Sequence, residues 1–230
     1  MTGAESISIG THMNKGNCIL IGAGDLTISE IPIQDGDLVI AVDGGYEYCK
    51  LLEITPDYIL GDFDSISEKE AESVAAIAKE NEDKVIILPV EKDDTDMLAA
   101  LKLGLEYGYT NFNIYAATGG RLEHTIANIQ CLLYLKNHDA VGYIMDGNGM
   151  IFVMQNEEVR FKDTLEGYLS IFALGKSAKG VTIKGMKYEL NQDTLTNDFP
   201  IGISNEFIGK EALVRVEDGE LVGIISYVQD

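Results

Sequence analysis

Basic residues are scarce in this chain of 230 residues, which carries 17 Lys and Arg against 38 Asp and Glu and has a formal net charge of −21. Such a surface repels nucleic-acid backbones and anionic membranes, so we expect neither as a partner. An anionic substrate would need a metal ion or a local basic group to hold it. The hydrophobic content of 46% is ordinary for a globular protein, and the length fits one large domain or two small ones.

Cysteines, histidines and long apolar runs are also scarce. The three cysteines, Cys18, Cys49 and Cys131, form no CxxC pair and indicate reduced thiols in a cytoplasmic protein. The three histidines lie far apart, which argues against a zinc site. No apolar run approaches the roughly 20 residues that span a membrane, and the polar N-terminus shows no signal peptide. Residues 10–13 resemble a cloning scar, so the fold prediction leaves out residues 1–13.

An acidic motif follows an apolar run in the stretch Tyr58-Ile59-Leu60-Gly61-Asp62-Phe63-Asp64-Ser65. The apolar run is typical of a buried strand, and Asp62 and Asp64 share a face if the strand geometry continues past Gly61. Neighbouring carboxylates repel each other unless a cation neutralises them, and Mg²⁺ reaches carboxylates together with substrate phosphates. Taken alone, the pair is more typical of an acidic turn at a strand end.

Short apolar strands alternate with amphipathic helices over the first two thirds of the chain. This pattern predicts an α/β fold with an open, mostly parallel sheet and helices on both faces. The expected strands are 18–21, 38–42, 58–60, 85–88, 113–117 and 141–145. The expected helices are 46–52, 68–81, one from about 96 to 107 with Asp93 or Asp94 as N-cap, and one from 122 to 136 that buries Leu122, Ile126, Ile129 and Leu133.

Several polar residues come directly after these strands or at the helix starts beyond them. They are Asp43, Asp62, Asp64, Asp96 and the turn Thr118-Gly119-Gly120-Arg121. In open α/β sheets ligands bind beyond the carboxyl ends of the strands, so we expect these residues to converge on one edge. Gly22-Ala23-Gly24 follows the first strand without the third glycine of a dinucleotide fingerprint, which leaves a tight turn or a phosphate contact open.

The pattern changes after about residue 147, because no long helical period continues and short apolar runs alternate with turn residues. This predicts a C-terminal antiparallel β-sandwich. The runs are 150–154, 159–161, 168–173, 180–183, 206–208, 213–216 and 221–227. We therefore expect an α/β domain at 14–147 and a sandwich domain at 148–230. The dipeptide Ser204-Asn205 falls in a polar turn, where a turn-stabilising Asn is the simplest interpretation.

Motifs from both predicted domains occur in a characteristic order. They are Asp43-Gly44-Gly45, Gly61-Asp62-Phe63-Asp64-Ser65, Lys92-Asp93-Asp94-Thr95-Asp96, Thr118-Gly119-Gly120-Arg121 and Ser204-Asn205-Glu206-Phe207. In this order and spacing they resemble the thiamin pyrophosphokinase family, from about residue 18 to the C-terminus. The resemblance implies an α/β domain followed by a β-sandwich in a homodimer with active sites shared between subunits. It also implies Mg²⁺-dependent transfer of the pyrophosphoryl group of ATP to the hydroxyl group of thiamin, giving thiamin diphosphate and AMP.

The resemblance implies a role for each matching residue. Asp43, Asp62, Asp64 and Asp96 match the acidic residues around Mg²⁺ and the ATP phosphates. Lys92, Asp93, Thr118, Gly119, Gly120, Arg121 and His124 match the nucleotide-facing loops. Tyr188, Ser204 and Asn205 match positions near thiamin. Catalysis is then expected from Arg121, which can hold a phosphate bidentately, and from Asp64 or Asp96 as the acceptor of the thiamin hydroxyl proton. Glu123 stands where the family usually has Asp, and its role stays open.

Two other classes of function remain open at this point. One is another Mg²⁺-dependent enzyme on nucleotide-activated substrates that uses a single DxD motif, with no need for acidic residues at positions 43 and 96. The other is a non-catalytic sensor that binds nucleotide or thiamin without releasing AMP. Incubation with ATP, Mg²⁺ and thiamin separates the three classes by their products.

Overall fold

The computed structural model describes residues 7–8, 15–63, 68–89, 91 and 93–228. The chain forms two compact units, Met13–Asp146 and Gly147–Asp230, and Met1–His12 groups with the second of them. Across the described ranges, none of the helices combines the length and apolar character that a membrane-spanning segment needs.

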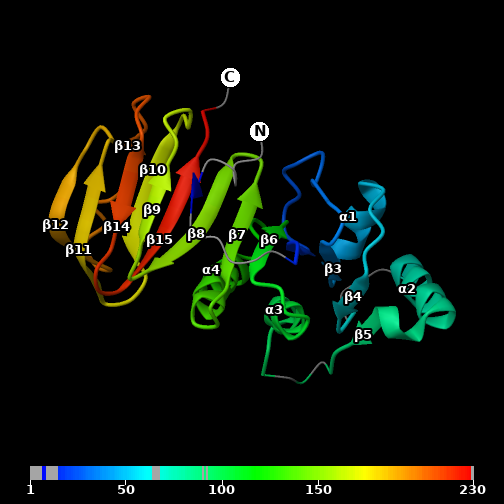
Figure 1. Cartoon of the computed structure of the whole chain (residues 1–230). Helices are drawn as coiled ribbons and strands as arrows, with labels where there is room; N and C mark the ends of the chain where they lie inside the picture. The colour runs from blue at the N-terminus through cyan, green and yellow to red at the C-terminus, as the bar shows by residue number, and fades with distance from the viewer. Residues whose placement is uncertain (1–6, 9–14, 64–67, 90, 92, 229–230) are drawn as a thin grey trace. The chain divides into compact units, whose positions relative to one another are not determined.

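A parallel sheet with the strand order β7-β6-β2-β3-β4-β5 forms the centre of the first unit (Figure 1). Its strands are β2 (Cys18–Ile21), β3 (Leu38–Val42), β4 (Tyr58–Gly61), β5 (Val85–Ile87), β6 (Asn111–Tyr115) and β7 (Val141–Asp146). Its helices are α1 (Gly45–Leu51), α2 (Glu68–Glu80), the 3₁₀ helix η2 (Glu82–Lys84), α3 (Asp96–Glu106) and α4 (Leu122–Lys136). The chain runs outward from β2 to β5 and then returns to the other side of β2 at β6. The order of the strands therefore reverses between β2 and β6.

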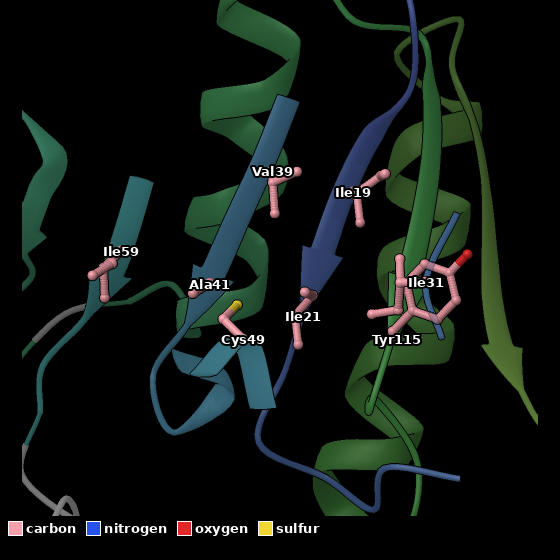
Figure 2. Close-up of a cluster of buried hydrophobic side chains, with 8 residues drawn as sticks. All are labelled: Ile19, Ile21, Ile31, Val39, Ala41, Cys49, Ile59 and Tyr115. Atoms are coloured by element: carbon pink, nitrogen blue, oxygen red, sulfur yellow. The ribbon is translucent and has the colours of Figure 1, made fainter. Parts of the chain in front are cut away.

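Helices cover both faces of this sheet, which confirms the predicted fold class. On one face Ile19, Ile21 and Val39 lie in a buried cluster with Cys49 of α1, as Figure 2 shows. On the opposite face α3 packs so closely that a Cβ on Gly104 would lie 2.7 Å from the Cys18 sulfur. Strands β2 and β3 are buried along their whole length, as expected for strands covered on both sides.

The buried face of α4 differs from the prediction. Leu122 and Ile126 are 70% and 50% exposed. The buried positions are instead Asn128, Cys131, Leu132 and Leu135. Both sets have the spacing of one helical face, so periodicity alone did not distinguish the face that packs on the sheet from its neighbour.

Several element ends in this unit differ from the prediction by one or two residues, and the end of β6 and the N-cap of α3 are two of the differences. Strand β6 ends at Tyr115 instead of residue 117, because Ala116 adopts a left-handed backbone with φ of 49°. The N-cap of α3 is Thr95, whose side chain accepts a hydrogen bond from the Leu98 amide at 3.2 Å, and neither Asp93 nor Asp94 takes that place.

The second unit contains two antiparallel sheets, which confirms the predicted C-terminal architecture. One sheet has the order β13-β10-β15-β8 and the other β1-β9-β14-β11-β12. The strands are β1 (Ile7–Ser8), β8 (Gly149–Gln155), β9 (Glu158–Phe161), β10 (Tyr168–Ala173), β11 (Ser177–Lys184), β12 (Leu190–Thr196), β13 (Asn205–Glu206), β14 (Ala212–Arg215) and β15 (Glu220–Ser226). Rings from both sheets meet inside, with centroids 6.2 Å apart for Phe152 and Phe161 and 5.5 Å apart for Phe161 and Phe207.

Two strands of this unit were not predicted. Strand β12 has no apolar run in its sequence, and Leu195 is its one buried residue. The strand lies at a sheet edge, where polar side chains can face water. Strand β1 falls within the residues left out of the prediction, yet Ile7 pairs with Phe161 on β9.

The buried rings of the second unit lead to a stability prediction. Phe161→Ala should lower the free energy of unfolding by about 3–5 kcal/mol, because Phe161 is fully buried between two other rings. Phe199→Ala is the matched control, since Phe199 is exposed and should change stability by less than about 1 kcal/mol. Urea denaturation of both variants measures the difference, and equal losses would contradict the packing described here.

Candidate active site

A cavity of about 380 Å³ opens at the carboxyl edge of the parallel sheet. Its walls come from the turns after β2, β3 and β6 and from the starts of α3 and α4. The lining residues are Gly22, Ala23, Gly24, Val42, Asp43, Thr95, Asp96, Met97, Ala116, Ala117, Gly119, Gly120, Arg121, His124, Ala127 and Asn128. The cavity thus lies where the strand order reverses between β2 and β6, the usual ligand position in open α/β sheets.

The turn after β2 runs beside the turn after β6 at the floor of the cavity. The Gly22 amide donates to the Tyr115 carbonyl at 2.9 Å, and the Gly24 amide donates to the Ala116 carbonyl at 2.7 Å. A Cβ on Gly24 would lie 2.3 Å from the Thr118 oxygen, so a side chain has no room there. The close approach of the two backbones therefore requires glycine at this position.

Two of the predicted aspartates face this cavity. Asp43 follows β3 with a left-handed φ of 51°, and Asp96 is the first residue of α3. Asp62 follows β4 and is half-buried, but it is not among the residues that line the cavity. The ends of β3 and β4 lie side by side, since the Asp43 amide donates to the Leu60 carbonyl at 2.7 Å. Asp64 lies outside the described residues.

The turn between β6 and α4 contributes backbone and two side chains. Gly119 and Gly120 both have positive φ, of 78° and 58°, and a Cβ on Gly120 would meet no atom within 4 Å. Arg121 and His124 line the cavity beside them. The backbone amides of this turn are therefore accessible to a ligand at the N-terminus of α4, where the helix dipole favours anions.

The remaining nucleotide-loop candidates lie elsewhere. The Thr118 hydroxyl donates to the Asp146 carboxylate at 3.0 Å, which ties the glycine turn to the end of β7. Asp93 is exposed and does not line the cavity, and Lys92 falls in a part of the chain that the structure does not describe.

Asn128 lines the cavity but is not among the site residues predicted from the sequence. Its side chain is buried and its amide nitrogen donates to the Ala117 carbonyl at 2.8 Å, which holds the backbone just after the left-handed Ala116. The sequence feature that could have indicated Asn128 as a site residue is its position one helical turn after His124. It was not recognised because the predicted buried face of α4 lay on another side.

The carboxylates of the cavity suit a hard cation. Asp43 and Asp96 supply oxygen ligands from two different elements, which is the ligand type that Mg²⁺ prefers. Within the ranges that the structure describes, no group of three or more His, Cys, Asp or Glu side chains is placed to hold a metal ion. Mg²⁺ commonly binds one or two carboxylates together with substrate phosphates, so the donor set fits a cation that arrives with a phosphate ligand.

A larger cavity, of about 600 Å³, lies between α1 and α2 and contains none of the predicted site residues. Its wall combines Cys49, Ile59 and Ile77 with lysine and glutamate side chains. Volume alone does not identify a site, and the smaller cavity carries the glycine turns and convergent carboxylates.

In the second unit, Asn205 and Tyr188 line a cavity of about 80 Å³. The buried Asn205 side chain accepts a hydrogen bond from the Tyr188 amide at 2.9 Å and donates one to the Tyr188 carbonyl at 2.6 Å. The oxygen and the nitrogen of the Asn205 side chain are thus both bound to the backbone of Tyr188. The Tyr188 ring is exposed. Ser204 has a φ of 56°, and its amide donates to the Ser170 hydroxyl at 3.0 Å.

Comparisons with known proteins match both units. The family described as thiamin pyrophosphokinase, catalytic domain, matches residues 32–144, and the vitamin B1 binding domain of the same family matches residues 154–221. A thiamine pyrophosphokinase of Bacillus subtilis is 32% identical over 191 residues, which cover 82% of this chain and 87% of that protein.

Solved structures agree with the sequence comparison. The crystal structure of a Bacillus subtilis thiamine pyrophosphokinase has a TM-score of 0.81 at 28% identity and covers 93% of this chain and 100% of that one. A thiamin pyrophosphokinase structure from Geobacillus thermodenitrificans has a TM-score of 0.77 at 26% identity and covers 93% of this chain and 99% of that one.

Proposed function

Since this chain belongs to the thiamin pyrophosphokinase family, we propose how its residues carry out the family's reaction, the transfer of the pyrophosphoryl group of ATP to the hydroxyl group of thiamin. The observation that carries the proposal is the single cavity that joins Asp43, Asp96 and the Gly119-Gly120-Arg121 turn. We assign the catalytic role to residues 14–147 and thiamin binding to residues 148–230.

The triphosphate of ATP binds in the cavity at the β2–β6 reversal. Asp43, Asp96, Asp62 and Asp64 would hold Mg²⁺ together with the phosphates of ATP. The bound ion would neutralise the charge of the phosphates. In a chain with a net charge of −21, this neutralisation is what allows an anionic substrate to enter an acidic site.

The turn before α4 also binds the phosphates. The amides of Gly119 and Gly120 donate to phosphate oxygens, and Arg121 adds a fixed positive charge. His124 lies one turn along the same helix, and Lys92 and Asp93 complete the nucleotide-facing loops. Thr118 holds the turn in position, because its hydroxyl donates a hydrogen bond to the Asp146 carboxylate.

The chemical step is an attack by the thiamin hydroxyl on the β-phosphorus, with AMP as the leaving group. Asp64 or Asp96 accepts the hydroxyl proton, and Arg121 stabilises the charge on the phosphoryl oxygens. Most of the acceleration comes from positioning and charge neutralisation, because phosphoryl transfer needs little covalent participation from the protein.

Thiamin binds through the second unit, at Tyr188, Ser204 and Asn205. The exposed Tyr188 ring offers a face for the thiazolium cation, and Asn205 fixes the backbone that carries this ring. We propose that two copies of this chain form a homodimer, in which the α/β unit of one subunit and the sandwich of its partner complete each site.

The Asn205 contacts predict a specific kinetic defect. Asn205→Ala should raise the KM for thiamin by about tenfold and change the KM for ATP by less than about twofold, because it releases the Tyr188 backbone and touches no ATP-binding residue. Steady-state kinetics with each substrate varied in turn measure both constants. Gln192→Ala is a control with an exposed polar residue on β12, and an equal rise in both KM values for Asn205→Ala would contradict the assignment.

We also propose a cytoplasmic location, supported by the state of the cysteines. Cys18, Cys49 and Cys131 are all free and buried. Burial raises the pKa of the Cys49 thiol to about 12 and that of Cys131 to about 11, so both stay protonated at neutral pH. Protonated thiols of this kind suit a reducing compartment.

A further inference from the structure

An ion pair at the start of α4 connects the cavity to Glu123, a residue without an assigned role. The Arg121 Nε donates a hydrogen bond to Glu123 Oε1 at 2.8 Å. Arg121 is the residue before the first turn of α4 and lines the cavity, whereas Glu123 is not one of the lining residues. Among the residues that line the cavity, Arg121 is the one that forms an ion pair with Glu123 in the part of the chain that the structure describes.

The Glu123 carboxylate also interacts with the helix on which it lies. It accepts a hydrogen bond from its own backbone amide, and this bond, followed by the hydrogen bond from Arg121, lowers the pKa of Glu123 below its ordinary value. It also lies in the first turn of α4, where the helix dipole favours a negative charge. Glu123 thus offers Arg121 a charged acceptor in the first turn of the helix that follows the Gly119-Gly120 turn.

The atom that Glu123 binds determines which part of Arg121 can reach a phosphate. A guanidinium group has N–H donors on Nε and on both terminal nitrogens, arranged in one plane. With Nε bound to Glu123, a bidentate contact along the Nε side of the group is blocked. The two terminal nitrogens remain, and they can bind a phosphate end-on.

Stability does not account for this pair. The side chains of Arg121 and Glu123 are 73% and 65% exposed, and exposed ion pairs of this kind contribute little to folding. The orientation of a charged group beside a reacting phosphate, in contrast, has a large effect on rate.

We propose that Glu123 is a positioning residue for Arg121, which accepts the Nε–H and directs both terminal nitrogens toward the phosphates of ATP. The proposal rests on the assignment of Arg121 to ATP under the proposed function. This role gives a reason for an acidic residue beside a site for an anion, because the negative charge of Glu123 binds the guanidinium group of Arg121.

The test is a double-mutant cycle of Glu123→Ala and Arg121→Ala with steady-state kinetics and thermal denaturation. Glu123→Ala should lower kcat by about tenfold, leave the KM for thiamin unchanged and leave Tm unchanged. In the Arg121→Ala background, the same change should lower kcat by less than about twofold, because no arginine remains to be oriented. Glu123→Gln keeps an acceptor oxygen and should restore kcat to within about threefold of wild type.

Asp218→Ala is the matched control, since Asp218 pairs with Lys179 at 3.0 Å with side chains 72% and 61% exposed, and it should not change kcat. The proposal is overturned if Glu123→Ala keeps wild-type kcat, if Glu123→Gln is as slow as Glu123→Ala, or if Glu123→Ala costs the same factor with and without Arg121. In this last case a slow Arg121→Ala enzyme still supports the proposed function. Wild-type turnover of Arg121→Ala would instead overturn both assignments.

Discussion

Asp96→Asn should lower the turnover of ATP and thiamin by at least about a hundredfold, and Asp43→Asn should do the same. Each substitution removes a negatively charged carboxylate from the cavity wall while keeping the size of the side chain. Asn also tolerates the left-handed backbone of Asp43, whose φ is 51°, so the fold should be preserved. Initial rates at saturating Mg²⁺ measure the loss.

Asp139→Asn is the matched control for Asp43→Asn. Asp139 also has a left-handed φ, of 55°, and is exposed after α4, away from the residues of the cavity. It should keep wild-type turnover. Without Mg²⁺, Asp43→Asn and Asp96→Asn should be at least as stable as wild type, because a repelling carboxylate is gone from an acidic cavity. Near wild-type turnover in both variants would contradict the metal assignment.

Mixing an Asp96→Asn variant with a thiamin-binding variant should raise activity above that of either parent if each site is shared between subunits. Asp96→Asn damages the first unit and Asn205→Ala damages the second, so a mixed dimer contains one site in which both halves are wild type. By the symmetry of two sites, activity should recover to at most about half of wild type per mixed dimer. The assay uses thiamin well below the wild-type KM, where Asn205→Ala alone retains about a tenth of wild-type turnover, and the rise above this level measures the restored site.

The control for this experiment mixes Asp96→Asn with Asp43→Asn. Both substitutions lie in the first unit, so every mixed dimer still has a damaged first unit at each site, and no activity should appear. Native mass spectrometry establishes that mixed dimers form. If such dimers form in the first mixture and turnover does not rise above that of the two parents, each site belongs to one chain and the shared-site proposal is wrong.

The convergence of these residues on one edge was predictable because the carboxyl ends of parallel strands share that edge. Asp43 and the Gly119-Gly120-Arg121 turn follow strands, Asp96 begins α3, and all of them line one cavity. The contribution of Gly22 and Gly24 was left open, because it depends on β6 lying beside β2. That neighbour relationship is a property of strand order, which local sequence does not encode.

Other features depend on tertiary contacts that local patterns do not specify. Two faces of α4 have apolar residues at helical spacing, and packing on the sheet selects the one with Asn128, so Leu122 is exposed. The interpretation of Asn205 as a turn-stabilising residue matches its contacts, but its partner is Tyr188, which is distant along the chain. Strand β12 is polar because it lies at an edge, where burial does not require an apolar run.

The most direct test of the proposed reaction is ³¹P NMR of a turnover mixture that contains the wild-type chain, ATP, Mg²⁺ and thiamin. Transfer of the pyrophosphoryl group predicts that AMP and thiamin diphosphate grow together in equal amounts, and that neither appears when thiamin is omitted. Formation of ADP with thiamin monophosphate would place the attack at the γ-phosphorus and contradict the proposed chemistry. Binding of both substrates without any new phosphorus signal would show that the cavity holds nucleotide without catalysis.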